Sequence, residues 1–206
     1  MNWDDVLFSV SGGTGPIDIK PGETITVDFA WDQKDEGGRQ VQPGWYNVIF
    51  GEITVRQENS SYTFNPGANI LIQYPQGVME KSFDLDQSRT VSGVTMTLKH
   101  VELTTESASF SFFFIPPGYT ASPSRPGMPP IPPIMSIMAK AEYTVNGATK
   151  YAGTAGFKTQ GDGIGLIWGG GPGKLDPVPS DAKEMTFTIT QLNDWEGPWI
   201  FQIPLQ

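Results

Sequence analysis

Short stretches in which apolar and polar residues alternate recur along most of this chain. In residues 199–205, for example, Trp199, Phe201, Ile203 and Leu205 fall on one side of an extended backbone. A period of two is typical of half-buried β-strands, whereas an amphipathic helix repeats its apolar residues every three to four positions. The only helical hint is a single turn at residues 180–183. The pattern therefore predicts a fold built from strands.

The alternation predicts ten strands, and Gly51 is expected to interrupt the second of them with a bulge or bend. They cover residues 23–31, 45–55, 68–74, 93–103, 107–115, 138–145, 150–157, 163–168, 185–192 and 199–205. The 24 glycines and 18 prolines of the chain supply turns between them. Short strands separated by turns, in a chain of 206 residues, predict an all-β fold of two β-sandwich domains.

Two breaks in the pattern suggest the domain organisation. Residues 56–66 are polar and precede Gly67, so we expect domains at 1–58 and 59–206. The first offers only about four strands where a sandwich of this type needs about seven. Either it packs on the second domain or it lacks its own first strands, and an exposed edge would then favour an edge-strand homo-oligomer. Residues 116–133 hold eight prolines and are interpreted as a long inserted loop, with a docking segment for an aromatic groove as the alternative.

Charge and composition exclude several classes of partner. The net charge is −9, and the 13 Lys and Arg residues are scattered, so the chain lacks the basic stripe of a nucleic-acid-binding protein. No apolar run approaches the roughly 18 residues of a membrane span, which predicts no membrane insertion. Cysteine is absent, and this excludes disulfides and thiolate metal sites.

Catalytic motifs are incomplete wherever they begin. The single histidine, His100, alternates with Val94, Met96 and Leu98 and is interpreted as a strand residue rather than a general base. Residues 84–88 have the first spacings of a calcium loop, but Arg89 takes the position of the required glycine. Residues 169–174 resemble a phosphate loop without its first glycine or its final hydroxyl residue. We therefore expect no enzymatic activity and no cofactor.

Two sets of residues remain as candidates for ligand binding. Asp32, Asp35 and Glu36 could gather oxygens around a cation, although a solvated hairpin end is the favoured interpretation, and we expect no metal. Exposed tryptophan rings can stack on sugars, and Trp3, Trp168 and Trp195 are the rings expected to be exposed. These residues keep a carbohydrate-binding function open.

Residues 20–55 resemble the second half of the BsuPI-like intracellular proteinase inhibitor module, which has an immunoglobulin-like fold. The residues that match are Pro21-Gly22-Glu23, Trp31, Asp32, Asp35, Gly38, Pro43-Gly44 and Tyr46. Most of them form turns or end strands, so the resemblance implies the fold, two immunoglobulin-like β-sandwich domains of which the first is incomplete, more than inhibition. A proteinase inhibitor remains an alternative function.

Residues 80–206 resemble the C-terminal β-sandwich domain of unknown function found in Gram-positive anti-sigma-factor-like surface proteins. The resemblance lies in residues 91–103, 143–147 and 196–205. It implies an extracytoplasmic or cell-surface module, whereas the acidic start Met1-Asn-Trp-Asp-Asp lacks the basic region of a signal peptide. We therefore expect either a cytoplasmic chain or part of a longer surface protein. The favoured function is a non-catalytic module for binding, sensing or cell-surface architecture, with a protein or cell-surface partner.

Overall fold

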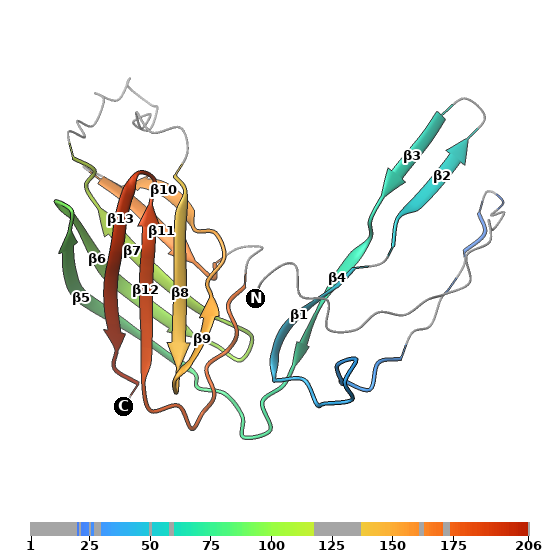
Figure 1. Cartoon of the computed structure of the whole chain (residues 1–206), viewed down its shortest axis with the longest axis horizontal. Helices are drawn as coiled ribbons and strands as arrows, with labels where there is room; N and C mark the ends of the chain where they lie inside the picture. Colours follow the sequence, from blue (N-terminus) through green and yellow to red (C-terminus); the bar gives the residue numbers. More distant parts are fainter. Residues whose placement is uncertain are drawn as a thin grey trace. The chain divides into compact units, whose positions relative to one another are not determined.

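The computed structural model describes residues 20, 22–24, 26, 30–49, 51–57, 60–117, 137–160, 163–170 and 174–205 (Figure 1). Within these ranges the chain contains no helix, and every pair of strands is antiparallel, so the predicted all-β class is confirmed. It follows that none of the described residues forms a helix able to cross a membrane. The chain separates into two compact units, Met1–Gln42 and Pro43–Gln206.

Thirteen strands lie in the second unit. They are β1 (Gly44–Ile49), β2 (Ile53–Gln57), β3 (Ser60–Phe64), β4 (Gly67–Ile72), β5 (Lys81–Val91), β6 (Val94–Leu103), β7 (Ala108–Phe114), β8 (Ala139–Val145), β9 (Ala148–Tyr151), β10 (Gly156–Gln160), β11 (Gly163–Trp168), β12 (Met185–Leu192) and β13 (Trp195–Ile203).

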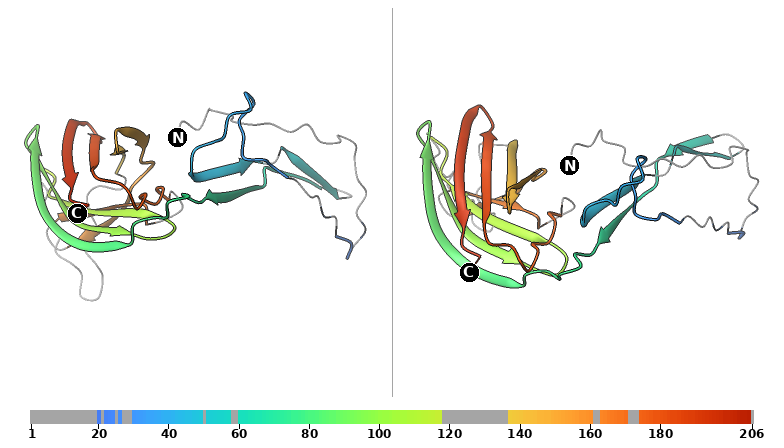
Figure 2. Two further views of the ribbon diagram at one scale, coloured as in Figure 1. Left: turned by 90° about the horizontal axis from the view of Figure 1, so that it is seen from below. Right: turned by 60° about the horizontal axis from the view of Figure 1, so that its bottom comes forward.

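The last nine strands form a sandwich of two sheets (Figures 1 and 2). One sheet has the order β10-β11-β7-β6-β5 and the other β13-β12-β8-β9. Tight turns join the paired neighbours: Asn146 and Gly147, between β8 and β9, have φ angles of 47° and 79°. Asn-Gly favours this left-handed pair because it matches the right-handed twist of the strands. The chain passes from one sheet to the other after β7, after β9 and after β11.

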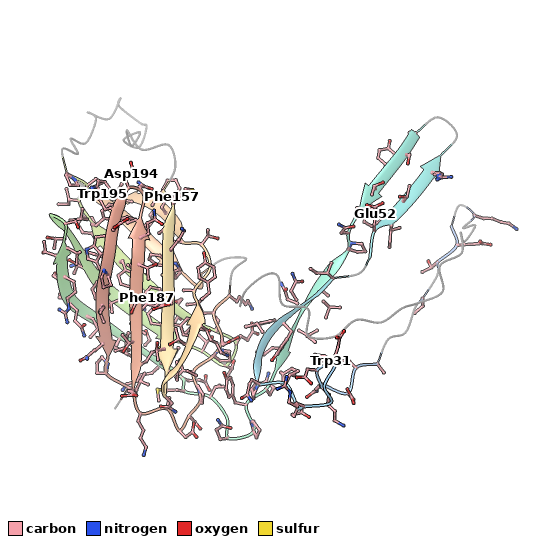
Figure 3. The ribbon with its side chains drawn as sticks, in the orientation of Figure 1. Trp31, Glu52, Phe157, Phe187, Asp194 and Trp195 are labelled. Atoms are coloured by element: carbon pink, nitrogen blue, oxygen red, sulfur yellow. The ribbon has the colours of Figure 1, made fainter. Side chains whose placement is uncertain are left out.

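Aromatic side chains from both sheets fill the space between them. Phe112 of β7 lies 5.2 Å from Phe187 of β12 and 5.1 Å from Phe201 of β13, measured between ring centroids. Trp199 is fully buried, and its Nε1 donates a hydrogen bond of 2.9 Å to the carbonyl oxygen of Val94 in the opposite sheet. Tilted and edge-to-face contacts of this kind add to the free energy of burial. The core that the described residues form accordingly belongs to the sandwich, with Phe187 at its centre (Figure 3).

Three parts of the strand pattern differ from the prediction, and the first is β3, which was not predicted because residues 56–66 are polar. β5 was not predicted, because its acidic residues 84–88 read as a failed calcium loop; in the structure these residues lie in an edge strand paired with β6. The predicted strand 150–157 is wrong as a single element. It is divided into the ends of β9 and β10, which belong to opposite sheets, and the crossing between them includes Gly153 at φ 68°.

The first four strands form a two-stranded ribbon made of two successive pairs. β1 pairs with β4, β2 pairs with β3, and the predicted break at Gly51 lies between Ile49, the end of β1, and Ile53, the start of β2. Residues 58 and 59, where the sequence placed a domain boundary, stand between the paired strands β2 and β3. The predicted strand 23–31 and insert 116–133 lie largely outside the described residues.

Candidate functional site

The hairpin of β2 and β3 has one apolar face that remains exposed. Ile53 pairs with Phe64 and Val55 pairs with Tyr62, so these four side chains share a face. Each is between 43% and 61% exposed. The opposite face carries Thr54 and Thr63, whose hydroxyls lie 3.2 Å apart. We call these four apolar side chains the hairpin face.

The ribbon is also open along its edges. β2 and β3 pair with each other and, within the described ranges, with no further strand. Natural edge strands are usually protected by Lys, Pro or bulges, but neither residue type occurs in β2 or β3 and their pairing is regular. A two-stranded hairpin is only marginally stable in water and needs a third strand or a packing surface. Among the described residues, this hairpin therefore has two unpaired edges and one exposed apolar face.

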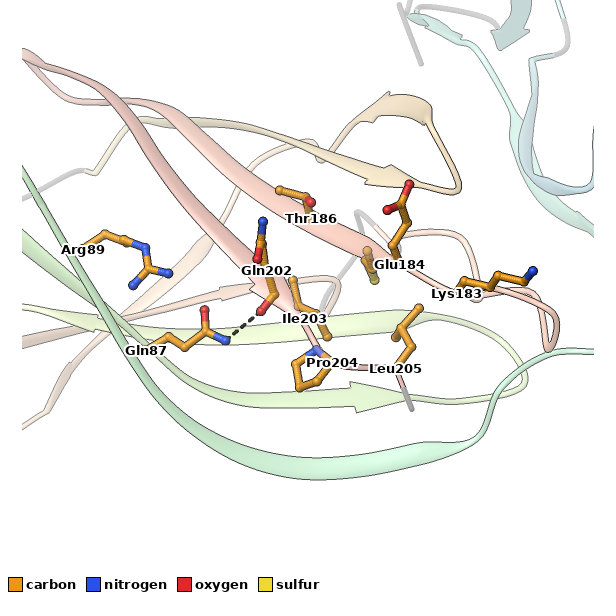
Figure 4. Close-up of a pocket in the computed structure, with 10 residues that line it drawn as sticks. Gln87, Arg89, Lys183, Glu184, Thr186, Gln202, Ile203, Pro204 and Leu205 are labelled. Carbon is orange, nitrogen blue, oxygen red and sulfur yellow. Dashed lines mark hydrogen bonds between the residues drawn. The ribbon is translucent and has the colours of Figure 1, made fainter.

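The sandwich protects a comparable edge. Side chains of β5 cap the carbonyl oxygens along the free side of β13: Gln87 donates to Gln202 at 2.7 Å, and Arg89 donates to Ile200 at 3.0 Å. Lys81 caps Leu205 at 3.1 Å in the same way. A shallow groove at this seam, about 490 Å³ in volume, is lined by Gln87, Gln202 and their neighbours (Figure 4). With these carbonyls already bonded, β13 is a poor template for another strand.

A polar cluster ties the first strand of the ribbon to the sandwich. The Asp176 carboxylate accepts hydrogen bonds from the backbone N–H of Trp45 at 2.6 Å, from Lys150 Nζ at 2.6 Å and from the Tyr143 hydroxyl at 3.2 Å. Gly44 is required here, because a Cβ at this position would lie 2.8 Å from the Asp176 carboxylate and its φ is 138°. Nothing in the local sequence marks Asp176, since its partner Trp45 is 131 positions away.

The cluster raises the pKa values of three tyrosines and of Lys150. Burial raises the pKa of the Tyr143, Tyr74 and Tyr46 hydroxyls above the usual range, and Asp176 adds to the effect. Burial of Lys150 opposes its charge, but the Asp176 carboxylate outweighs burial, so the pKa of Lys150 also lies above its ordinary value. The arrangement keeps an ammonium group, a carboxylate and neutral phenols together at neutral pH. We interpret it as an anchor, because its donors and acceptors are already satisfied by each other.

Trp45 supplies a second attachment. Its indole Nε1 donates a hydrogen bond of 2.6 Å to the carbonyl oxygen of Glu106, and Lys174 Nζ lies 4.7 Å from the centre of its ring. Lys174 also forms an ion pair of 2.7 Å with Glu106. This contact holds the pKa of the Glu106 carboxyl below its usual value. The first strand of the ribbon is thereby fastened to the sandwich, whereas the hairpin of β2 and β3 beyond it is not.

The residues predicted as a cation site are used for local turn contacts. Asp35 accepts hydrogen bonds of 2.9 Å from the backbone and from Nε of Arg39, and these bonds hold the pKa of its carboxyl below the usual value. Asp32 accepts a bond from the backbone N–H of Lys34 at 3.2 Å. Among the described residues no three His, Asp or Glu side chains, Glu36 included, come together in a way that could hold a metal ion. The favoured interpretation of a hairpin end agrees with the isolated bridge between Lys34 and Gln40.

The tryptophans predicted as sugar-stacking rings do not form a common surface. The prediction that the Trp168 ring is exposed is wrong. The ring is fully buried, and it packs edge-to-face against Phe112 with ring centroids 5.3 Å apart. Trp195 begins β13 at the turn near Asp194, where it is half-buried and packs against the core (Figure 3). Trp3 lies outside the described residues.

His100 lies on the outer face of the sandwich beside two residues of the edge strand β5. Its Nδ1 is 2.8 Å from an Asp84 carboxylate oxygen and its Nε2 is 3.4 Å from the Ser82 hydroxyl. The three residues have the order of a serine-hydrolase triad, but the Asp84 side chain is 92% exposed. Catalysis by such a triad depends on a buried carboxylate and on donors aimed at an oxyanion. The contacts are therefore interpreted as pairing between strand side chains.

Comparison of the chain with protein families, with curated proteins and with solved structures finds no match.

Proposed function

We propose that the chain is a non-catalytic binding module that acts outside the cytoplasm and recognises a protein partner through the β2–β3 hairpin. The observation that carries this proposal is the exposed hairpin face on strands whose outer edges are unpaired within the described ranges. An extended segment that joins an open edge gains backbone hydrogen bonds, and alternate side chains of that segment gain apolar contacts. Both kinds of contact are offered here by the same hairpin.

The contrast between the two parts of the chain supports this assignment. The sandwich closes its core and caps the β13 edge with Lys81, Gln87 and Arg89, so it serves as a rigid base. The anchor at Asp176 joins that base to β1. A rigid base that carries an uncovered hairpin is typical of a recognition element held on a scaffold. The surface location follows from the resemblance of residues 80–206 to the sandwich domain of Gram-positive surface proteins.

A peptide-display experiment tests the proposal. Random peptides on phage would be selected on the immobilised chain, and selected peptides would be measured against Tyr62→Lys and against Thr63→Lys. Tyr62 belongs to the hairpin face, whereas Thr63 lies on the opposite face of the same strand, which makes the second variant a matched control. We expect peptides with alternating apolar residues that bind the wild type and the Thr63→Lys chain but lose binding to Tyr62→Lys.

Equal binding to both variants would refute the hairpin as the recognition surface. The same preparation should leave a panel of proteases fully active and should bind no polysaccharide on a glycan array. Inhibition of a protease, or glycan binding that survives Tyr62→Lys, would instead support the inhibitor or the carbohydrate function.

A further inference from the structure

We propose that the protein partner of the hairpin is a second copy of this chain, paired antiparallel along β2 with Thr54 on the two-fold axis. This inference rests on the proposed function and specifies its partner. Edge pairing of two identical strands is self-complementary, because an antiparallel pair of equal strands has two-fold symmetry. The pairing would convert two hairpins of two strands each into one sheet of four, which is past the size at which sheets become independently stable.

The charges of the hairpin match this register. When Thr54 lies opposite Thr54 of the second copy, each residue of β2 faces the residue of the second copy whose number makes their sum 108. Glu52 then lies opposite Arg56 of the second copy, and this opposite-charge contact occurs twice. Glu52 and Arg56 are both exposed, and no ion pair engages either of them among the described residues. Opposite charges directly across a strand pair stabilise it, whereas like charges destabilise it.

The apolar residues fit the same register. Ile53 lies opposite Val55 of the second copy, so the hairpin faces of the two copies join into one continuous apolar surface. Ile53 and Val55 share one side of β2 by their spacing, and Thr54 and Arg56 share the other. A shift by one residue would set Glu52 against Val55 and separate the apolar side chains from each other. Charge and apolar pattern therefore select one register.

The distribution of charge favours this part of the chain for self-association. The whole chain carries a net charge of −9, so two copies repel each other in general. Between Gly44 and Ile72 there are only three charged residues, Glu52, Arg56 and Glu58, and their net charge is −1. Two copies that approach along the ribbon therefore meet little of this repulsion. β2 and β3 contain neither Lys nor Pro, and the one charged side chain within them, Arg56, faces Glu52 of the second copy in this register.

Single-cysteine variants test the register, because the native chain contains no cysteine. Residues opposite each other in an antiparallel pair have Cα atoms about 4.5–5.5 Å apart, within the range that a disulfide spans. Thr54→Cys should therefore form a covalent dimer under mild oxidation. Thr63→Cys is the matched control: Thr63 pairs with Thr54 on the same polar face, but it lies on β3, away from the axis. Cross-linking of Thr63→Cys alone, or of both variants equally, would overturn the proposed register.

Charge reversal tests the same pairing without oxidation. Sedimentation velocity over the micromolar range should show the wild type in reversible equilibrium between monomer and dimer. Glu52→Arg or Arg56→Glu should weaken the dimer by about tenfold, because two exposed charge pairs become repulsive. The double variant Glu52→Arg/Arg56→Glu restores the opposite charges and should recover the wild-type equilibrium. Circular dichroism of each variant verifies that the sandwich remains folded.

The outcomes separate this inference from the function on which it rests. A chain that stays monomeric across the concentration range overturns the second copy as partner. If peptides still bind the wild type and lose binding to Tyr62→Lys, the hairpin remains a recognition surface for a different protein. If no peptide depends on Tyr62 either, the proposed function fails as well. Reversed charges that leave a dimer unchanged would place the dimer contact elsewhere and would overturn the inference.

Discussion

Replacement of Asp176 by Asn should strongly destabilise the protein, although the two side chains have nearly the same size and shape. The change preserves the shape of the side chain but removes the charge that faces Lys150 Nζ at 2.6 Å. The carboxylate also accepts bonds from Trp45 and Tyr143. Breaking a fully buried ion pair costs about 3–5 kcal/mol. Asp176 is 14% exposed and Lys150 is 35% exposed, so water recovers part of that loss. We expect the free energy of unfolding to fall by about 2–3 kcal/mol, between the values for exposed and buried pairs.

The pair of Asp86 and Lys99 provides a matched control. Its nitrogen–oxygen distance is also 2.6 Å, but Asp86 is 83% exposed. Asp86→Asn should therefore cost no more than about 1 kcal/mol, as is usual for surface pairs. Urea denaturation of the three proteins, followed by circular dichroism, measures both differences. Equal destabilisation by the two substitutions would refute the reasoning, because burial would then have no influence on the strength of the pair. The double variant Lys150→Met/Asp176→Asn should recover part of the loss, since no unpaired charge remains.

Further predictions concern alkaline pH, the core and the tryptophans. The pKa values of Lys150 and Tyr143 are higher in the folded state than in the unfolded state, where they lie near 10. The stabilisation that these two groups provide is therefore complete below about pH 10 and is lost as the pH rises through their folded-state pKa values. We expect the urea concentration at the unfolding midpoint to decrease once the pH exceeds about 10. Tyr143→Phe should reduce that fall. Phe187→Ala removes a fully buried ring that contacts Phe112 and should cost about 3–5 kcal/mol in the same assay. Acrylamide should quench Trp195 in a Trp195-only variant more strongly than Trp168 in a Trp168-only variant, and the reverse order would contradict their burial.

Much of the sandwich could be predicted from the sequence, because its inner strands alternate cleanly. In β6 and β7, buried positions recur every second residue apart from an irregularity between Leu98 and His100. β5 was missed although Phe83 and Leu85 alternate with acidic residues, because Asp84 and Asp86 have the spacing of a calcium loop. It is an edge strand with one solvated face, and it pairs with β6. Edge strands are specified by their neighbours more than by their own composition.

The candidate sites show a similar division. Trp168 was misplaced because the glycines after it suggested an exposed turn, although its alternation with Ile164 and Leu166 already indicated the core face. The anchor could not be predicted, since Asp176, Lys150 and Trp45 are brought together only by contacts distant in the sequence. The hairpin could have been predicted from the sequence, because Ile53 and Val55 alternate with polar residues and so do Tyr62 and Phe64. The polar character of residues 56–66 concealed the second strand of the hairpin, β3.

The central claim is that two copies of the chain pair through the β2–β3 hairpin and that the sandwich is its support. Hydrogen exchange of the wild-type chain, measured at low and at high protein concentration, tests this claim most directly. Backbone amides in the core strands β6 and β12 should be strongly protected at both concentrations. Amides of β2 should exchange rapidly in dilute solution and become protected as the concentration rises. Protection of β2 that is independent of concentration, or a concentration effect confined to the sandwich, would contradict the account.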